Sequence, residues 1–376
     1  MPNPITTFFT AGQPTLAARL MATKNRPSGF DYMRIVLALG VIASHAFLLS
    51  YGPDVQYGRL ANMGFSLTTL IVPMFFALSG FLVAGSLERT RTLVSFMGLR
   101  VFRIMPALSV EVLLSALILG PLLTTLPLGE YLTHPDFHLY FWNVLGHIHY
   151  ELPGLFETNP LQSVNGQLWT VPYELACYVV LCMLAVLGIF RDRIWLLWFM
   201  VLLHALQIGN TVLRPNLDYH GAGGTTLVMS FIAGLLVYRF RDKLVWSARC
   251  ALAMAALSLL LITLPNGIRF AALPIAYFTV YLGLLNPPRQ ATLLGGDYSY
   301  GIYLYGYPIQ QMVVALLPQH REWYINMLLA TPCTIAIAYC SWWLIEKPVM
   351  DRRQILTTLE NWYLSKVAGK VRSPST

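Results

Sequence analysis

Charged residues are scarce in this sequence. Only 11% of its 376 residues are Asp, Glu, Lys or Arg, and 56% are hydrophobic, whereas about a quarter of the residues of a soluble domain are charged. A soluble fold could not hide this much apolar surface from water, so burial in lipid is the economical explanation. The composition predicts a polytopic membrane protein and excludes an ordinary soluble domain.

Cysteine motifs are also missing. The five cysteines lie in apolar runs, none of them in a CxxC pair: Cys177, Cys182, Cys250, Cys333 and Cys340. We therefore expect reduced packing residues and no disulfide framework. The histidines of the longest loop (His134, His138, His147 and His149) have no cysteine neighbours, and the one pair with i, i+4 spacing, His134 and His138, lies in a segment expected to be a loop rather than a helix. We expect no metal site.

Three further absences narrow the possible functions. No basic stripe with interleaved aromatic residues occurs, so the net charge of +8 gives no support for a nucleic-acid partner. No G-x-S-x-G motif is present, which argues against a serine hydrolase of the strand-turn-helix type. The first thirty residues are polar and contain proline, with no uninterrupted apolar core, which argues against a cleaved signal peptide.

Apolar runs of helix length fill most of the chain. Each is long enough for an α-helix to cross the hydrocarbon, so the predicted fold class is an all-α polytopic membrane protein with about ten transmembrane helices. We place them at 31–50, 62–87, 106–126, 168–190, 194–209, 224–240, 246–264, 269–286, 298–318 and 324–346. With a cytosolic amino terminus, 21 of the 25 lysines and arginines lie inside, and Arg59, Arg214, Arg269 and Arg321 lie outside. The positive-inside rule then predicts that both termini are cytoplasmic.

This topology divides the chain into three parts. Residues 1–30 form a cytoplasmic N-terminal segment, 31–346 the transmembrane domain, and 347–376 a cytoplasmic tail without its own core. Within the domain, residues 88–105 mix apolar and basic positions before Pro106, which suits an amphipathic helix on the inner membrane surface. Residues 127–167 form the longest outer loop.

The first span carries two unusual side chains, Arg34 and His45. Ionisable groups inside such a run are costly unless they serve a function. Eleven helical steps come within about 20° of three full turns, so both side chains lie on one face, roughly 16 Å apart along the axis. A guanidinium can hold an anion near the membrane surface, and an imidazole deeper in can act as base or nucleophile. This geometry suggests a long substrate with an anionic head.

A second pair of arginines lies at the expected inner surface. Arg100 and Arg103 are three positions apart, on one helix face, where two guanidinium groups can grip phosphates. A plain topology anchor explains the same pair. Because Arg34 lies at the same membrane level, we favour a site where three arginines bind an anion.

Glu174 is the carboxylate that we pair with His45. It lies about six residues into a span entered from outside, roughly 9 Å below the surface, and His45 reaches a similar level. The two groups could be a base and its orienting partner, or a structural hydrogen bond between helices. Ser79 and Gly80, in PMFFALSGF, are better explained as small residues for close helix packing than as catalytic groups.

Taken together, these residues resemble acyltransferase family 3, the membrane O-acyltransferases of bacterial surface saccharides. The matching elements occur in the family's order: Arg34 and His45 with ten residues between them, FFxLSG at 75–80, RxxRIxP at 100–106, NGxLWTxxxE at 165–174, SYGIYLYGYP at 299–308 and ExP at 346–348. The chain has Gly306 where members commonly carry a histidine, so the resemblance assigns no second histidine role.

The resemblance implies an enzyme of the bacterial inner (cytoplasmic) membrane. It would move an acyl group, usually from acetyl-CoA in the cytosol, to a hydroxyl of an extracytoplasmic saccharide or glycolipid acceptor. It carries over His45 as the catalytic residue and Arg34, Arg100 and Arg103 as critical positions. The alternative is a transporter of a lipid-linked or anionic solute, which paired interrupted helices in the two halves would favour; we find no such pair in the sequence.

Overall fold

A helix lies in each of the ten ranges expected to span the membrane. The computed structural model describes residues 12–55, 68–213, 223–291 and 295–371, so Arg59, Arg214, residues 62–67 of the expected second span and both chain ends lie outside the described residues. The ten helices are α3 (Gly29–Tyr51), α5 (Thr68–Arg89), α6 (Leu93–Leu114), α10 (Val171–Val186), α11 (Arg193–Leu213), α12 (Gly224–Arg239), α13 (Ala248–Thr263), α14 (Ala272–Gly283), α16 (Ser299–Leu316) and α17 (Trp323–Ser341). The described residues contain helices and connecting segments but no strand, and their only bridge is an isolated one between Thr15 and Val245. The all-α class is confirmed.

Within the described residues, six helical stretches are long and apolar enough to cross a membrane. They are Gly29–Tyr51, Thr68–Arg89, Leu93–Leu123, Gly166–Val186, Arg193–Asn210 and Trp323–Lys366. Helices α12, α13 and α14 are apolar but shorter. The protein is therefore a membrane protein, and the count of ten spans stays a prediction.

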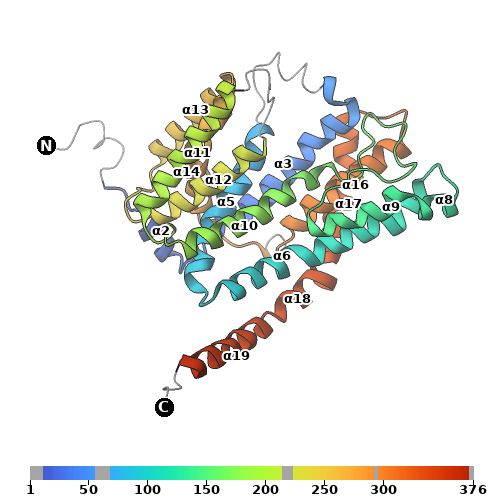
Figure 1. Cartoon of the computed structure of the whole chain (residues 1–376). Coiled ribbons are helices and arrows are strands. Elements are labelled where there is room, and N and C mark those ends of the chain that lie inside the picture. Colours follow the sequence, from blue (N-terminus) through green and yellow to red (C-terminus); the bar gives the residue numbers. More distant parts are fainter. Residues whose placement is uncertain (1–11, 56–67, 214–222, 292–294, 372–376) are drawn as a thin grey trace.

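Helix α12 is the centre of the bundle, because it is buried along almost its whole length. It lies against α5 at two glycines. A Cβ atom on Gly80 would lie 2.1 Å from the carbonyl oxygen of Phe231, and one on Gly234 would lie 2.2 Å from that of Ala77. Only hydrogen fits at such distances, so the packing role expected of Gly80 is confirmed. Figure 1 shows α11, α13 and α14 gathered on one side of this pair and α16 and α17 on the other.

The segment around Pro106 differs from the expectation. We expected a surface helix over 88–105 that ends before Pro106, but α6 runs through this proline and continues as a π-helix (Ser115–Leu119) and α7 (Gly120–Leu123). Proline removes one backbone hydrogen bond, and a packed membrane helix tolerates that loss. The RxxR pair therefore lies on the same continuous helix as the apolar span that follows it.

The long outer segment 127–167 is more ordered than a loop. It contains α8 (Leu128–Thr133), α9 (Pro135–Tyr140) and a 3-10 turn, η2 (Phe141–Leu145). Its last part returns into the bundle, where the Asn159 amide donates to Gln311 of α16. A second 3-10 turn, η3 (Gly166–Thr170), then leads into α10. The NGQLWT motif is thus buried by protein directly before the start of α10.

The C-terminal tail is helical as well. After a π-helix, η5 (Trp342–Glu346), the chain forms α18 (Lys347–Asp351) and α19 (Gln354–Val371). Figure 1 shows α19 extending away from the bundle. It remains attached to the start of α6, where the Thr92 hydroxyl donates to Glu360 at 2.8 Å. Residues 372–376 lie outside the described residues.

Candidate active site

The three arginines singled out from the sequence line one pocket. It has a volume of about 130 Å³ and lies between α3, α5, α6, α10 and α16. Arg34 comes from α3, while Arg100 and Arg103 come from α6. One wall is apolar, with Val72, Phe76 and Leu82 from α5 among its residues. Cationic side chains thus face an apolar wall across a narrow space.

Two of these arginines are already paired with carboxylates that the sequence analysis did not connect to them. Asp297 Oδ2 lies 3.1 Å from Arg34 Nη1 and 2.8 Å from Arg103 Nη2. Arg103 Nη1 also lies 3.7 Å from Glu346 Oε2. The contact of Asp297 with the arginines could not be predicted, because Asp297 lies in a polar connection just before α16, far from both arginines in the chain. Its position two residues before the SYGIYLYGYP motif was the available signal.

Asp297 connects α3 and α6, two helices that line the pocket. Burial opposes its ionisation, but the guanidinium groups of Arg103 and Arg34 outweigh that effect and hold the pKa of Asp297 at about 2, below its ordinary value of 3.8. The Ser299 hydroxyl donates to its other oxygen at 2.8 Å. The carboxylate therefore stays ionised at neutral pH and fixes both arginines.

Asp297→Asn should lower the free energy of unfolding by about 2 kcal/mol, because two cations lose their shared anion in a partly buried site. Asp297 has a lowered pKa in the folded protein, so its contribution is complete above pH 3.8 and is lost as the pH falls toward about 2. Thermal unfolding in detergent measures the change. Asp351→Asn is the control, since Asp351 forms an exposed pair with Lys347. Equal melting temperatures for the two variants would contradict this role.

Arg100 differs from the other two arginines in its partners. Among the described residues it forms no ion pair, and its Nη2 donates to Ser86 Oγ at 3.2 Å. Its guanidinium carbon lies 5.8 Å from the Phe96 ring centre and 5.9 Å from that of Tyr178. Aromatic faces hold the cation in place without neutralising it.

Glu174 lies in this same pocket, on the first turn of α10. It accepts a hydrogen bond from the Tyr178 hydroxyl. Counting from residue 168 predicts that Glu174 lies near the outer surface, and this depth stays a prediction. Asn165, Gln167 and Leu168, just before α10, are almost completely buried, so this turn is surrounded by protein. Glu174 therefore lies in the same pocket as the arginines.

His45 does not line the pocket. Its ring meets Tyr307 of α16 edge to face, with the ring centres 5.0 Å apart. The Tyr307 hydroxyl lies 2.6 Å from Ser163 Oγ. The described residues contain no hydrogen bond between His45 and Glu174, so the expected direct pairing is not formed. Their membership of one site stays a prediction.

Helix α16 connects the two locations. Tyr303 lines the arginine pocket, and Tyr307, one turn further along, contacts His45. The Tyr303 hydroxyl donates to the Gln167 carbonyl at 2.7 Å and lies 2.6 Å from the Thr170 hydroxyl. Tyr303 therefore joins α16 to the NGQLWT turn at the arginine pocket.

No cluster of three or more His, Cys, Asp or Glu side chains able to hold a metal occurs in the parts of the chain that the structure describes. His147 Nδ1 and His149 Nε2 lie 2.9 Å apart, as an isolated pair. None of the five cysteines, all of which are described, forms a disulfide; Cys177 is buried in the bundle, whereas Cys333 and Cys340 are exposed on α17.

Comparisons with known proteins identify the family of this chain. Residues 28–347 match the model of a family described as an acyltransferase domain. The chain is 26% identical over 338 residues to an "O-acetyl transferase" of Shigella phage Sf6, covering 86% of this chain and 96% of that protein. It is 30% identical over 366 residues to "Nodulation protein 10" of Rhizobium leguminosarum bv. viciae, covering 88% of this chain and 95% of that protein. No solved structure matches significantly. The chain belongs to acyltransferase family 3 and is an acyltransferase enzyme.

Proposed function

We propose that this protein transfers an acetyl group from cytosolic acetyl-CoA to a hydroxyl of an extracytoplasmic or lipid-linked saccharide. The observation that carries the proposal is the arrangement along α3. Arg34 lines a pocket of arginines, and His45 lies eleven residues further along the same helix, roughly 16 Å away by helix rise. The pantetheine arm of CoA, on the order of 15 to 20 Å long, compares with this separation.

The pocket suits the polar parts of such a donor. Arg100 Nε and the Tyr300 hydroxyl are buried there without hydrogen-bond partners among the described residues. Buried polar atoms are normally paired, so atoms left without partners favour a ligand that pairs them. Phosphate oxygens accept from guanidinium groups, and the apolar wall of α5 suits the thioester arm. Arg100 would bind the phosphates, with Arg34 and Arg103 supporting it while they hold Asp297.

The proposed chemistry places His45 near the acceptor. As a general base it would take the proton of the sugar hydroxyl while the oxygen attacks the thioester carbonyl and the CoA thiolate leaves. As a nucleophile it would first accept the acetyl group and then pass it to the sugar. Glu174 is the second proposed catalytic residue. Either route makes an ester and releases CoA.

The topology completes the proposal. Ten spans with both termini cytoplasmic place most lysines and arginines inside, and the Arg34 end of α3 then faces the cytosol, where acetyl-CoA is made. A bacterial inner membrane supplies these two sides. His45 would lie about two-thirds of the way toward the outer surface.

Arg100→Ala should weaken acetyl-CoA binding at least tenfold, because a charge-assisted hydrogen bond contributes about 1.5 to 3 kcal/mol. Titration of the purified, folded variant in detergent measures the affinity. Arg100 gives a cleaner test than Arg103, whose loss would also leave Asp297 and Glu346 without their partner. The control is Arg91→Ala, which removes an exposed arginine just before α6. Unchanged affinity in the Arg100 variant would favour the topology-anchor interpretation of this arginine pair.

A further inference from the structure

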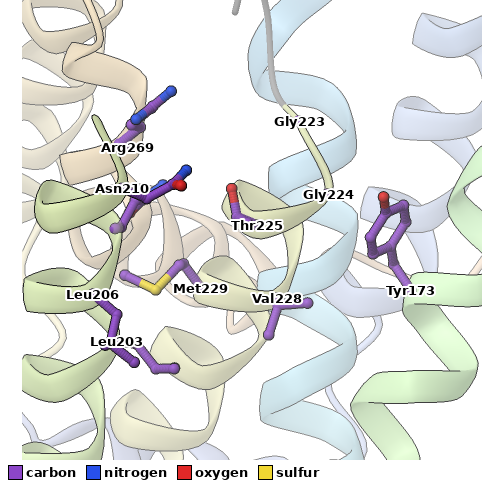
Figure 2. Close-up of a pocket in the computed structure, with 11 residues that line it drawn as sticks. Tyr173, Leu203, Leu206, Asn210, Gly223, Gly224, Thr225, Val228, Met229 and Arg269 are labelled. Carbon is purple, nitrogen blue, oxygen red and sulfur yellow. The ribbon is translucent and has the colours of Figure 1, made fainter. Parts of the chain in front are cut away.

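A second, larger cavity lies away from the arginine pocket. It has a volume of about 430 Å³ and lies between α11, α12 and the 3-10 turn η4 (Gly267–Phe270), with Tyr173 of α10 at its edge. This size is typical of sites for small organic ligands. Figure 2 shows its side chains arranged by polarity.

One end of the cavity is polar. In Figure 2 the side chains of Asn210 and Thr225 face one another across it, and Arg269 lies beyond Asn210. Arg269 is only 8% exposed, although the topology places it among the few cations on the outer side. Gly223 and Gly224 add the N-terminal end of α12, which favours anions.

The local fold holds Arg269 in this position. Asn266 adopts a left-handed conformation (φ 58°) at the start of η4. A Cβ atom on Gly267 would lie 2.0 Å from the carbonyl oxygen of Leu261, so only glycine fits there. Phe270 stacks on His204 of α11, with ring centres 6.0 Å apart. The turn is therefore fixed against both neighbouring helices.

The other end of the cavity is apolar and faces lipid. Leu203 and Leu206 of α11 and Met229 of α12 line it. Leu206 is 61% exposed. Trp198 and Leu202 are also exposed on α11, and exposed apolar residues on a membrane-spanning helix contact hydrocarbon. A lipid chain can enter the cavity from the side.

We infer that this cavity binds the lipid phosphate that carries the saccharide acceptor. The phosphate would lie against Arg269, Asn210 and the first turn of α12, and the hydrocarbon chain would lie along Leu206 and Met229. This inference rests on the proposed function. Tyr173 immediately precedes Glu174, so a sugar on that phosphate would lie near a wall shared with the arginine pocket.

Binding of three probes to the purified protein in detergent tests the inference. Farnesyl phosphate should bind at least tenfold more tightly than farnesol, which lacks the phosphate, and than inorganic phosphate, which lacks the chain. Arg269→Gln should weaken farnesyl phosphate binding at least tenfold, whereas Arg321→Gln, another arginine of the outer side, should leave it unchanged. Equal affinity for farnesol would overturn the phosphate assignment, and equal affinity for inorganic phosphate would overturn the lipid assignment.

A second variant keeps the test decisive if Arg269→Gln fails to fold. Leu206→Trp changes an exposed side chain and fills the apolar end, so farnesyl phosphate should bind at least tenfold more weakly to a folded protein. Unchanged binding in this variant would overturn the site. Acetyl-CoA titration of the same variant separates the two proposals. Wild-type donor affinity together with unchanged lipid binding would refute this cavity while leaving the donor site intact.

Discussion

Replacing His45 with alanine is expected to abolish acetyl transfer and to leave acetyl-CoA binding close to that of the wild type. General-base catalysis contributes about 10² to 10⁴ in rate, and loss of a nucleophile removes more. Donor affinity should persist because the arginines lie roughly 16 Å away along α3, and His45 does not line their pocket. Single-turnover transfer and equilibrium titration measure the two quantities separately.

Tyr307→Phe is the matched control for His45. It keeps the ring that meets the imidazole edge to face and removes only the hydroxyl that contacts Ser163. This variant should retain most of the activity. If His45→Ala keeps more than a small fraction of wild-type transfer, His45 is a packing residue of the α3 and α16 contact.

Glu174→Gln is expected to reduce turnover about 100-fold or more, the lower range for loss of an acid or base. The amide keeps the shape of the side chain and can still accept from the Tyr178 hydroxyl. Acetyl-CoA affinity should not fall, because the substitution removes a negative charge from the pocket that we propose binds an anionic donor. Measurement of kcat and of donor Kd on the same preparation separates these effects.

The control for Glu174 is Tyr178→Phe, which removes the hydrogen bond to the carboxylate and keeps its charge. A smaller loss of turnover is expected. Wild-type turnover in Glu174→Gln would show that the carboxylate only balances the neighbouring guanidinium groups. Equal losses in the two variants would make the hydrogen bond, rather than the charge, the important feature.

The positions of the helices followed from apolar runs, since both lipid and protein interiors exclude polar residues. Gly80 was also predictable, because a small residue in an apolar helix permits close approach. The convergence of Arg34, Arg100 and Arg103 followed from placing each at the same membrane level. These features depend only on local sequence and on the depth that each residue is expected to have in the bilayer.

Other features depend on contacts that the chain order hides. Asp297 reaches Arg34 and Arg103 only because α16 starts beside α3 and α6. The membrane depth of Glu174 stays a prediction, because an apolar run cannot show whether lipid or protein buries it, and the turn before α10 is buried by protein. Pro106 was expected to end its helix, because a proline without a backbone N–H breaks helices in water. In a packed membrane helix the loss of that hydrogen bond is tolerated, so α6 continues through Pro106.

Mass spectrometry of surface saccharides tests the central claim most directly. Cells would carry the wild-type protein, the His45→Ala variant at equal membrane level, or neither. The account predicts an acetyl ester on a saccharide hydroxyl, removable by mild alkali, in the wild-type cells only. The same ester in cells with His45→Ala, or identical saccharides in all three strains, would contradict it.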